Sequence, residues 1–470
     1  MEFELNHRVC DRARLARDAR FDGRFFIGVT STGVYCRPVC PAPQPKPKNV
    51  RYFPSAAAAA EAGFRPCLRC RPEASPGTPA WLGASASVSR ALKLIGDSAL
   101  DEGGVENLSA RLGIGSRHLR RLFLRYLGAT PVAVAQTRRV HFAKKLIDET
   151  NLTMAQIAMA AGFGSIRRFN ATFQNLYERP PGDLRRAAAR DRVDLEAGHY
   201  TLRIGYRPPY DWSSLVDFLA ARATPGVETV TPGEYRRNIS LDGIEGAIAV
   251  RPVRGKNSLE LDIWYPNPAA LFRIVERTRR IFDVGADPAE VAGHLGKDPT
   301  LERSVRAHPG LRVPGCWDGF ELAVRAILGQ QVSVKGATTM AGRLASAFGQ
   351  PAHDGGVQFP GVSALSQADL TTIGLTRRRA ASIRGLAAAV ARGTIAFDGR
   401  LDADGFEKSV IAIPGIGPWT AQYVAMRLGE PDAFPSGDLY LRHLGARAEA
   451  WRPWRAYAAM HLWKEAGERT

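Results

Sequence analysis

Four cysteines near the start of the chain form two close pairs that could hold a metal ion. Cys36 and Cys40 have the spacing C-x3-C, and Cys67 and Cys70 have the spacing C-x2-C. Two such pairs can place four thiolates around one tetrahedral cation, and Zn²⁺ is the cation typical of all-thiolate sites. The spacing therefore predicts one zinc ion with these four ligands. Spacing alone fits a purely structural zinc as well as a reactive one, and structural sites are the commoner kind.

A second group of residues that could do chemistry lies near the other end of the chain. In the stretch IPGIGPWTAQYVA, Gly415 and Gly417 stand directly before an apolar, helix-like run, and a helical pattern also precedes them. The exposed amides of such a hairpin bind phosphate, so a helix-hairpin-helix that contacts DNA is predicted, with Gly415, Gly417 and Thr420 as its contacts. Asp438 follows in the Gly/Pro-rich loop AFPSGDLYLR. A lone Asp before a helix is most often only a cap.

The charge of the whole chain indicates the class of its partner. Lys and Arg exceed Asp and Glu by 64 − 46 = 18 over 470 residues. A balance this basic is typical of proteins that bind nucleic acid, although a solvated basic surface is the alternative. No apolar run is long enough to span a membrane, and the charged N-terminal stretch lacks the pattern of a secretory signal. We therefore expect a cytoplasmic protein that binds double-stranded DNA.

Four regions of different composition must position these residues. The expected domains are 1–78, with five of the six cysteines; 80–190, Arg-rich and helical; 199–310, with strand-like alternation in YTLRIGY and SLELDIWY; and 311–470, helix after helix. The predicted fold is a multidomain α+β protein. It combines a small zinc domain, an all-α double helix-turn-helix, a mixed sheet and helix subdomain, and an all-α helix-hairpin-helix subdomain.

The sequence around the cysteines closely resembles the N-terminal domain of the Ada adaptive-response proteins. The shared motifs in residues 25–73 are TSTGVY, C-R-P-x-C and G-F-R-P-C-x-R-C. The resemblance implies that Cys36, bound to zinc, accepts a methyl group from a methylphosphotriester in DNA. Zinc keeps such a sulfur as a thiolate at neutral pH. Methylation would remove one negative charge from the site and should strengthen DNA binding, which makes the repair event a switch.

The region 80–190 contains two helix-turn-helix patterns. Between Arg111 and Lys145 there are nine Lys or Arg and no Asp or Glu. The turns are expected at Gly113–Gly115 and at 162–165, and the second helix of each pair would enter the major groove. A basic helical bundle with a solvated face has the same spacing. The candidate DNA contacts are Arg117, Arg120, Arg121, Arg167 and Arg168.

The second of these patterns strongly resembles AraC-type regulators. The signatures are AMAAGFGSIRRF and YERPPGDLR, although Glu178 stands where the family has glycine. His118 and His141 are expected at the surface or facing phosphates.

From about His199 onward, the chain resembles AlkA-type 3-methyladenine DNA glycosylases. The similar stretches are YTLRIGYRPPYDWSSLVDFLAARATPGVETV, VPGCWDGFELAVRAILGQQVSV and RPWRAYAAMHLWKEAG. The resemblance implies that Asp438 is catalytic. Its carboxylate would stabilise the positive charge developing on the sugar and orient or deprotonate water.

The resemblance also assigns roles to residues around the hairpin. Trp419 stands where glycosylases that also nick DNA carry a lysine, which implies a monofunctional enzyme. Trp419, Tyr423 and Trp463 could hold a cationic flipped-out base by cation–π contact, with core packing as the alternative, above all for Tyr423. Gln330 matches the family's glutamine, and Gln331 stands where the family has a leucine wedge.

These observations predict a fused DNA alkylation-response protein. It would release alkylated purines from DNA, accept a methyl group on Cys36 and activate transcription. The alternative is a methylation-responsive activator whose glycosylase half only binds DNA. A monomer is expected, with RNA polymerase as a candidate further partner.

Overall fold

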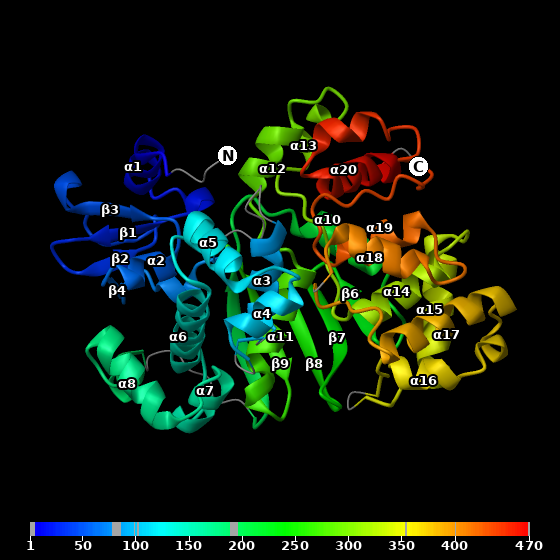
Figure 1. Ribbon diagram of the computed structural model, residues 1–470, viewed down its shortest axis with the longest axis horizontal. Coiled ribbons are helices and arrows are strands. Elements are labelled where there is room, and N and C mark those ends of the chain that lie inside the picture. Colours follow the sequence, from blue (N-terminus) through cyan, green and yellow to red (C-terminus); the bar gives the residue numbers. More distant parts are fainter. Residues whose placement is uncertain are drawn as a thin grey trace.

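The computed structural model describes residues 5–77, 86–97, 99–100, 103–188, 196–352, 355–399 and 401–468. A central antiparallel sheet lies between the small N-terminal sheet and most of the helices at the end of the chain (Figure 1). The boundary expected at 78–80 lies outside the described residues, and the one at 190–199 lies largely outside them. Within the described ranges, no helix is both long and apolar enough to cross a membrane.

The N-terminal part is a small four-stranded sheet with the order β3-β1-β2-β4. Strand β1 is antiparallel to β2 and β3, and β2 is parallel to β4. The elements are α1 (His7–Leu15), β1 (Phe26–Val29), β2 (Val34–Cys36), β3 (Val50–Phe53), α2 (Ala56–Glu61) and β4 (Arg65–Pro66). The first pair of cysteines therefore begins at the end of β2, and the second pair follows β4 directly.

The Arg-rich region is all helical and contains the two predicted helix-turn-helix units. The elements are α3 (Ala86–Gly96), α4 (Val105–Arg111), α5 (Ser116–Leu127), α6 (Pro131–Glu149), α7 (Met154–Ala160), α8 (Ile166–Tyr177) and α9 (Pro181–Ala188). Gly113 and Gly162 have φ of 71° and 75°, which lets the chain turn sharply between the two helices of each unit. The long helix α6 joins the two units.

The central sheet has the order β5-β9-β8-β7-β6, and all of its strand pairs are antiparallel. Its elements are β5 (His199–Gly205), α10 (Trp212–Ala220), β6 (Glu228–Thr231), β7 (Glu234–Leu241), β8 (Ile244–Pro252), β9 (Ser258–Trp264) and α11 (Leu271–Ile281). The two stretches that predicted strands, YTLRIGY and SLELDIWY, are paired neighbours in this sheet.

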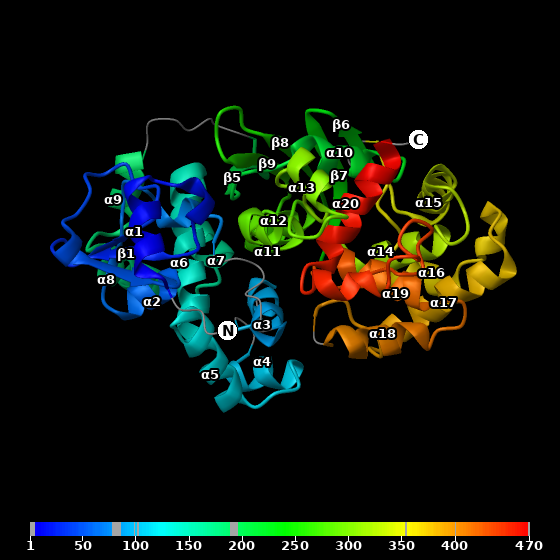
Figure 2. The same cartoon turned by 90° about the horizontal axis from the view of Figure 1, so that it is seen from above.

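The remaining helices form the last part of the chain (Figure 2). They are α12 (Pro288–Leu295), α13 (Glu302–Ala307), α14 (Gly319–Leu328), α15 (Val334–Phe348), α16 (Val362–Gln367), α17 (Arg377–Ala391), α18 (Ala403–Ile411), α19 (Pro418–Arg427) and α20 (Arg455–Glu468). Together with the sheets and the helix-turn-helix units, they confirm the predicted multidomain α+β class.

The hydrophobic cores do not follow the four regions of the sequence. One core joins the small N-terminal sheet to α3 and α5, through residues such as Phe53 and Phe123. A second core joins α6, α7 and α8 to the central sheet, and the rings of Phe142 and Phe272 lie 5.0 Å apart within it. The third core lies within the C-terminal helices. Because shared apolar burial is the main force holding elements together, the N-terminal half is packed onto the C-terminal half.

Candidate functional site

The structure brings the four predicted zinc ligands together. One sulfur from each of Cys36, Cys40, Cys67 and Cys70 lies within 4.8 Å of the other three. Three of these residues are buried, and Cys40 is half-buried. Strand β2 and the turn after β4 position them, because the parallel β2–β4 contact places Tyr35 opposite Pro66 and so aligns the two pairs.

The chemistry of this cluster fits a divalent cation. Hydrogen bonding from the Cys36 thiol lowers the pKa of Cys40 to about 7, while the neighbouring Cys40 and Cys67 sulfurs raise the pKa of Cys36. Four crowded sulfurs cannot all be thiolates unless a cation offsets their charge. The backbone N–H of Arg37 donates to Cys70 Sγ at 3.3 Å, a contact that would stabilise a metal-bound thiolate. These four cysteines therefore fit one zinc ion.

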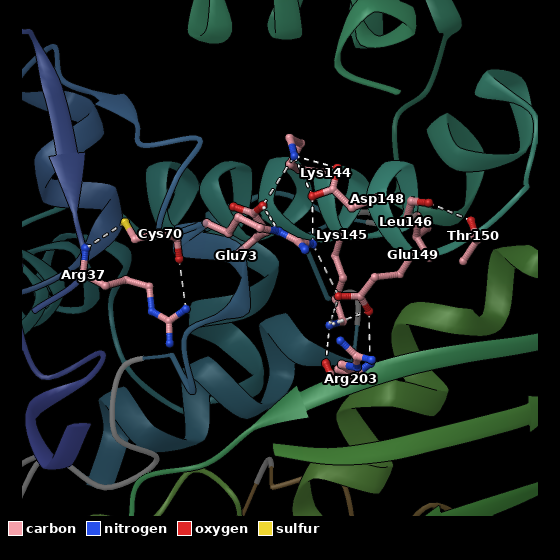
Figure 3. A network of polar contacts seen from close by, with 11 residues as sticks. Arg37, Cys70, Glu73, Lys144, Lys145, Leu146, Asp148, Glu149, Thr150 and Arg203 are labelled. Atoms are coloured by element: carbon pink, nitrogen blue, oxygen red, sulfur yellow. Dashed lines mark hydrogen bonds and ion pairs between the residues drawn. The ribbon is translucent and has the colours of Figure 1, made fainter. Parts of the chain in front are cut away.

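The loop that carries Cys70 is fixed to helix α6 by a network of charges (Figure 3). Arg71, next to Cys70, lies 2.8 Å from Asp148 and 3.5 Å from Glu149. The other oxygen of Glu149 accepts a hydrogen bond from the backbone N–H of Arg203 at 3.0 Å, and the Lys145 ammonium donates to the Arg203 carbonyl. Glu149 and Lys145 thus satisfy both backbone groups of one residue on β5, an edge strand of the central sheet.

His141 is placed differently from the prediction. It is a half-buried residue of α6 rather than a surface or phosphate-facing one, and its Nε2 lies 2.7 Å from the hydroxyl of Tyr35. Burial lowers the pKa of His141 to about 4. Tyr35, which is fully buried, directly precedes Cys36. The sequence shows no pattern that pairs these two residues, which lie 106 positions apart.

The arginines predicted to contact DNA are exposed on the second helix of each helix-turn-helix unit. Arg117, Arg120 and Arg121 lie on α5, and Arg167 and Arg168 lie on α8. The apolar faces of the same helices are buried, as shown by Phe123 and Phe169, both fully inaccessible. Each unit therefore presents a basic, solvent-facing helix, which is the arrangement that groove binding needs.

Glu178 occupies the left-handed cap that ends α8, with φ of 55°. Glycine adopts this conformation without strain, whereas other residues do so at a cost of about 1–2 kcal/mol. The Glu178 carboxylate forms an ion pair with Arg65 of the small sheet. The departure from the family pattern thus coincides with a contact between the second helix-turn-helix unit and the cysteine-bearing domain.

The hairpin between α18 and α19 has the predicted form. Gly415 has φ of 89°, and Gly417 caps α19 without a side chain in the way. The side-chain amide of Gln330 donates to the Gly415 carbonyl and to the Thr420 hydroxyl, each at 3.0 Å. Gln330 therefore fixes the hairpin to the end of α14. Its predicted contact with the substrate stays a prediction.

Thr420 and Gln331 lie in opposite environments. Thr420 is only 2% exposed, and its hydroxyl accepts the hydrogen bond from Gln330. Its predicted contact with DNA stays a prediction. Gln331 is exposed and has φ of 56°, a left-handed conformation at the turn between α14 and α15. The proposed wedge position thus projects from the surface beside the hairpin.

Asp438 lies beside the tryptophans predicted to line the base pocket. The indole N–H of Trp463 donates to Asp438 Oδ1 at 3.0 Å, and the backbone N–H of Tyr440 donates to the same oxygen at 2.9 Å. A Cβ on Gly437 would lie 3.3 Å from the Cβ of Trp419, so the loop passes directly against that residue. Asp438 itself is half-exposed. The Asp438 carboxylate is thus oriented by Trp463, and the loop that carries it passes against Trp419.

Tyr423 packs against both predicted pocket tryptophans and also contacts the interior. Its ring is stacked with Trp419 at 5.6 Å and 13°, and lies 6.3 Å from the Trp463 ring. Its hydroxyl faces the interior, where Arg427 donates a hydrogen bond to it at 2.9 Å. Burial opposes ionisation of this phenol, but Arg427 and Arg222 outweigh burial and lower its pKa. Sequence reasoning missed these two arginines, because no motif marks them.

A cavity of about 420 Å³ lies away from both sites. It is open to solvent on one side and lies where the small sheet, α3, α6, α11 and the loop after α19 meet, and Lys93 and Arg138 are among its lining residues. Its lining includes neither Asp438 nor any of the four clustered cysteines. The predicted chemistry therefore belongs to the surface around the hairpin and to the cysteine cluster, and the cavity marks an interface between the two halves.

Comparison with known families assigns a class to each part of the chain. Residues 9–73 match the metal binding domain of Ada, and residues 108–187 match a helix-turn-helix domain. Residues 201–318 match the AlkA N-terminal domain, and residues 324–466 match the HhH-GPD superfamily of base excision DNA repair proteins. The fold and the sites thus define a fusion of an Ada-type regulator with an AlkA-type repair enzyme.

Relatives of known name place the whole chain more closely. It is 43% identical over 97% of its length to a Mycobacterium tuberculosis protein named probable bifunctional transcriptional activator/DNA repair enzyme AlkA, and covers 95% of that protein. The chain belongs to this family of bifunctional AlkA proteins.

Two further relatives each match one half of the chain. The Escherichia coli DNA-3-methyladenine glycosylase 2 is 35% identical over 57% of this chain and 98% of its own length. The Bacillus subtilis bifunctional transcriptional activator/DNA repair enzyme AdaA is 32% identical over 37% of this chain and 80% of its own.

Proposed function

We propose that the C-terminal half is a monofunctional DNA glycosylase that releases alkylated purines of the 3-methyladenine type. The observation that carries this proposal is the hydrogen bond from the indole N–H of Trp463 to the carboxylate of half-exposed Asp438, in a loop whose Gly437 lies against Trp419. A cationic purine, flipped out of the duplex, would lie against these indole rings.

The reaction follows from this geometry. The bond between C1′ and the base nitrogen breaks, and its electron pair leaves with the base, which neutralises the cationic purine. The Asp438 carboxylate stabilises the positive charge that develops on the sugar. Water then adds to C1′ and loses a proton to this carboxylate or to solvent. Trp419 stands at the lysine position of bifunctional relatives and carries no amine, so strand cleavage is not expected.

The N-terminal cysteine site is proposed to take a methyl group from a DNA methylphosphotriester onto Cys36. A zinc ion bound by the four cysteines would supply a thiolate at neutral pH. The Cys36 sulfur attacks the methyl carbon, the carbon–oxygen bond breaks, and its electron pair stays on the phosphate oxygen. The products are a thioether and a phosphodiester. The loss of one negative charge from the site favours approach of the DNA backbone.

The exposed arginines of α5 and α8 suit promoter DNA, so transcription activation is the proposed consequence of methylation. Double-stranded DNA is the partner of both halves, RNA polymerase is a further candidate, and we propose a monomer in the cytoplasm. The experiment that tests the enzymatic half is release of free 3-methyladenine from alkylated duplex DNA. DNA binding without base release would instead identify an activator whose glycosylase half only binds.

A further inference from the structure

The helix-turn-helix region contacts the end of α19 and the loop before α18, on either side of the helix-hairpin-helix. Lys93 of α3 donates from Nζ to the carbonyl of Leu428 at 3.1 Å, and Leu428 is the residue that ends α19. Arg90, one turn earlier on α3, donates to the carbonyl of Gly399 at 2.9 Å, just before α18. Arg111, at the end of α4, pairs with Asp398 in the same loop at 3.1 Å. These contacts join residues about three hundred positions apart in the chain.

Helix α19 is the element that carries the base pocket. It begins at the hairpin and bears Trp419 and Tyr423 on successive turns. The last carbonyl groups of a helix have no partner within the helix and carry partial negative charge. The Lys93 ammonium supplies a hydrogen bond and a positive charge at this end of α19. A helix fixed at its C-terminal end holds the rings on its earlier turns in one orientation.

Lys93 is half-buried, in surroundings that disfavour its charge. Burial lowers the pKa of Lys93, and nearby Arg280 lowers it further, whereas Asp97 and Asp398 oppose the shift. The aliphatic part of the side chain packs closely on the loop before α18, because a Cβ on Gly399 would lie 3.4 Å from Lys93 Cδ. The hydrogen bond to Leu428 and this packing together hold the ammonium at the end of α19.

Helix α3 is itself held in place by the rest of the interface. Arg138 of α6 donates to the Leu92 carbonyl at 2.9 Å and to Glu276 of α11 at 2.6 Å. Asp97, just after α3, pairs with Arg280 of α11 at 2.9 Å. Helix α3 is therefore fixed on one side to α6 and α11, and on the other side to the loop before α18 and the end of α19.

We propose that Lys93 is a positioning residue of the glycosylase, although it lies in the regulator half of the chain. Through its contact with Leu428, helix α3 sets the orientation of α19 and hence of Trp419 and Tyr423. The inference rests on the proposed base-release function. It implies that the two fused halves form one functional unit, in which the N-terminal half is required for full repair activity.

The test uses the full-length protein with Lys93→Met, the conservative variant Lys93→Arg, and Lys297→Met as a matched control. Lys297 is exposed in the C-terminal half, and Lys297→Met removes the same positive charge as Lys93→Met. Hydrogen exchange at residues 424–430 is measured without DNA, and kcat/KM for 3-methyladenine release is measured with alkylated duplex.

Lys93→Met is expected to speed exchange at the end of α19 and to lower kcat/KM about three- to tenfold, the range expected for a cation at a helix C-terminus. Lys93→Arg should retain most of the wild-type protection from exchange and most of the wild-type kcat/KM, and Lys297→Met should match the wild type in both quantities. If Lys93→Met does not fold, Lys93→Gln takes its place, because it keeps a hydrogen-bond donor without the charge. Its exchange rate and kcat/KM are expected to lie between those of Lys93→Arg and those expected for Lys93→Met.

Unchanged exchange at 424–430, or changed exchange with unchanged base release, overturns the proposal. Failure of the proposed function gives a different result from failure of the Lys93 proposal. A wild-type protein that releases no base would contradict the proposed function. The exchange measurement would still decide whether Lys93 fixes α19.

Discussion

The indole N–H of Trp463 donates a hydrogen bond to the Asp438 carboxylate across 3.0 Å. Trp463 lies on α20 and Asp438 in the loop after α19, so the contact joins two elements around the proposed base pocket. We therefore propose two separable functions for the indole, in which its N–H orients the carboxylate and its ring offers a face to a cationic base.

Trp463→Phe should separate these functions. Phenylalanine keeps an aromatic face but loses the N–H, and a hydrogen bond to a charged group contributes about 1.5–3 kcal/mol when it is well buried. Because Asp438 is half-exposed, we expect kcat to fall about tenfold, with little change in affinity for alkylated DNA. Single-turnover rates and binding curves measure the two quantities. Equal loss of both would show that the indole acts mainly as a pocket wall.

Cys36→Ala should abolish methyl uptake from methylphosphotriester DNA, because none of the other three cysteines occupies the acceptor position. Cys316→Ala serves as the control, since Cys316 lies outside the four-cysteine cluster. Mass spectrometry of the methylated wild-type protein should place the methyl group on the peptide that contains Cys36. A methyl group found on Cys40 instead would overturn the assignment.

Removal of charge from the exposed helices should weaken promoter binding without affecting base release. For Arg121→Ala on α5 and Arg168→Ala on α8, each lost phosphate contact is expected to reduce the slope of log K against log salt by about 1. Arg254→Ala, an exposed change in the turn between β8 and β9, is the control. An unaltered slope in both helix variants would argue against groove binding by these helices.

Glu178→Gly should leave the protein as stable as the wild type or stabilise it by up to about 2 kcal/mol. Glycine removes the strain of the left-handed cap, about 1–2 kcal/mol, while the exposed ion pair with Arg65 contributes only about 0–1 kcal/mol. Urea denaturation measures the difference. A clear loss of stability would mean that the contact with Arg65 matters more than the cap.

The sequence predicted those features that local pattern determines. Spacing placed the four cysteines in one site, and glycine turns placed the two helix-turn-helix units and the hairpin. Resemblance to known families brought Asp438 and Trp463 into one site, and the structure places them in contact.

Contacts between parts of the chain that are distant in sequence could not be predicted in this way. Tyr35 with His141, and Lys93 with the Leu428 carbonyl, join side chains to partners more than a hundred residues away. Neither pair has a period, a spacing or a turn that marks it. The buried hydroxyl of Thr420 has the same explanation, because its partner Gln330 lies on a different helix-loop segment.

The most direct test of the central claim is release of free 3-methyladenine from alkylated duplex DNA by the wild type and by Asp438→Asn, prepared and assayed together. Asparagine keeps the size of the side chain but cannot stabilise a cationic sugar or accept a proton from water. The account predicts release by the wild type and a rate about 10²–10⁴-fold lower in the variant. Equal release by both proteins would contradict it.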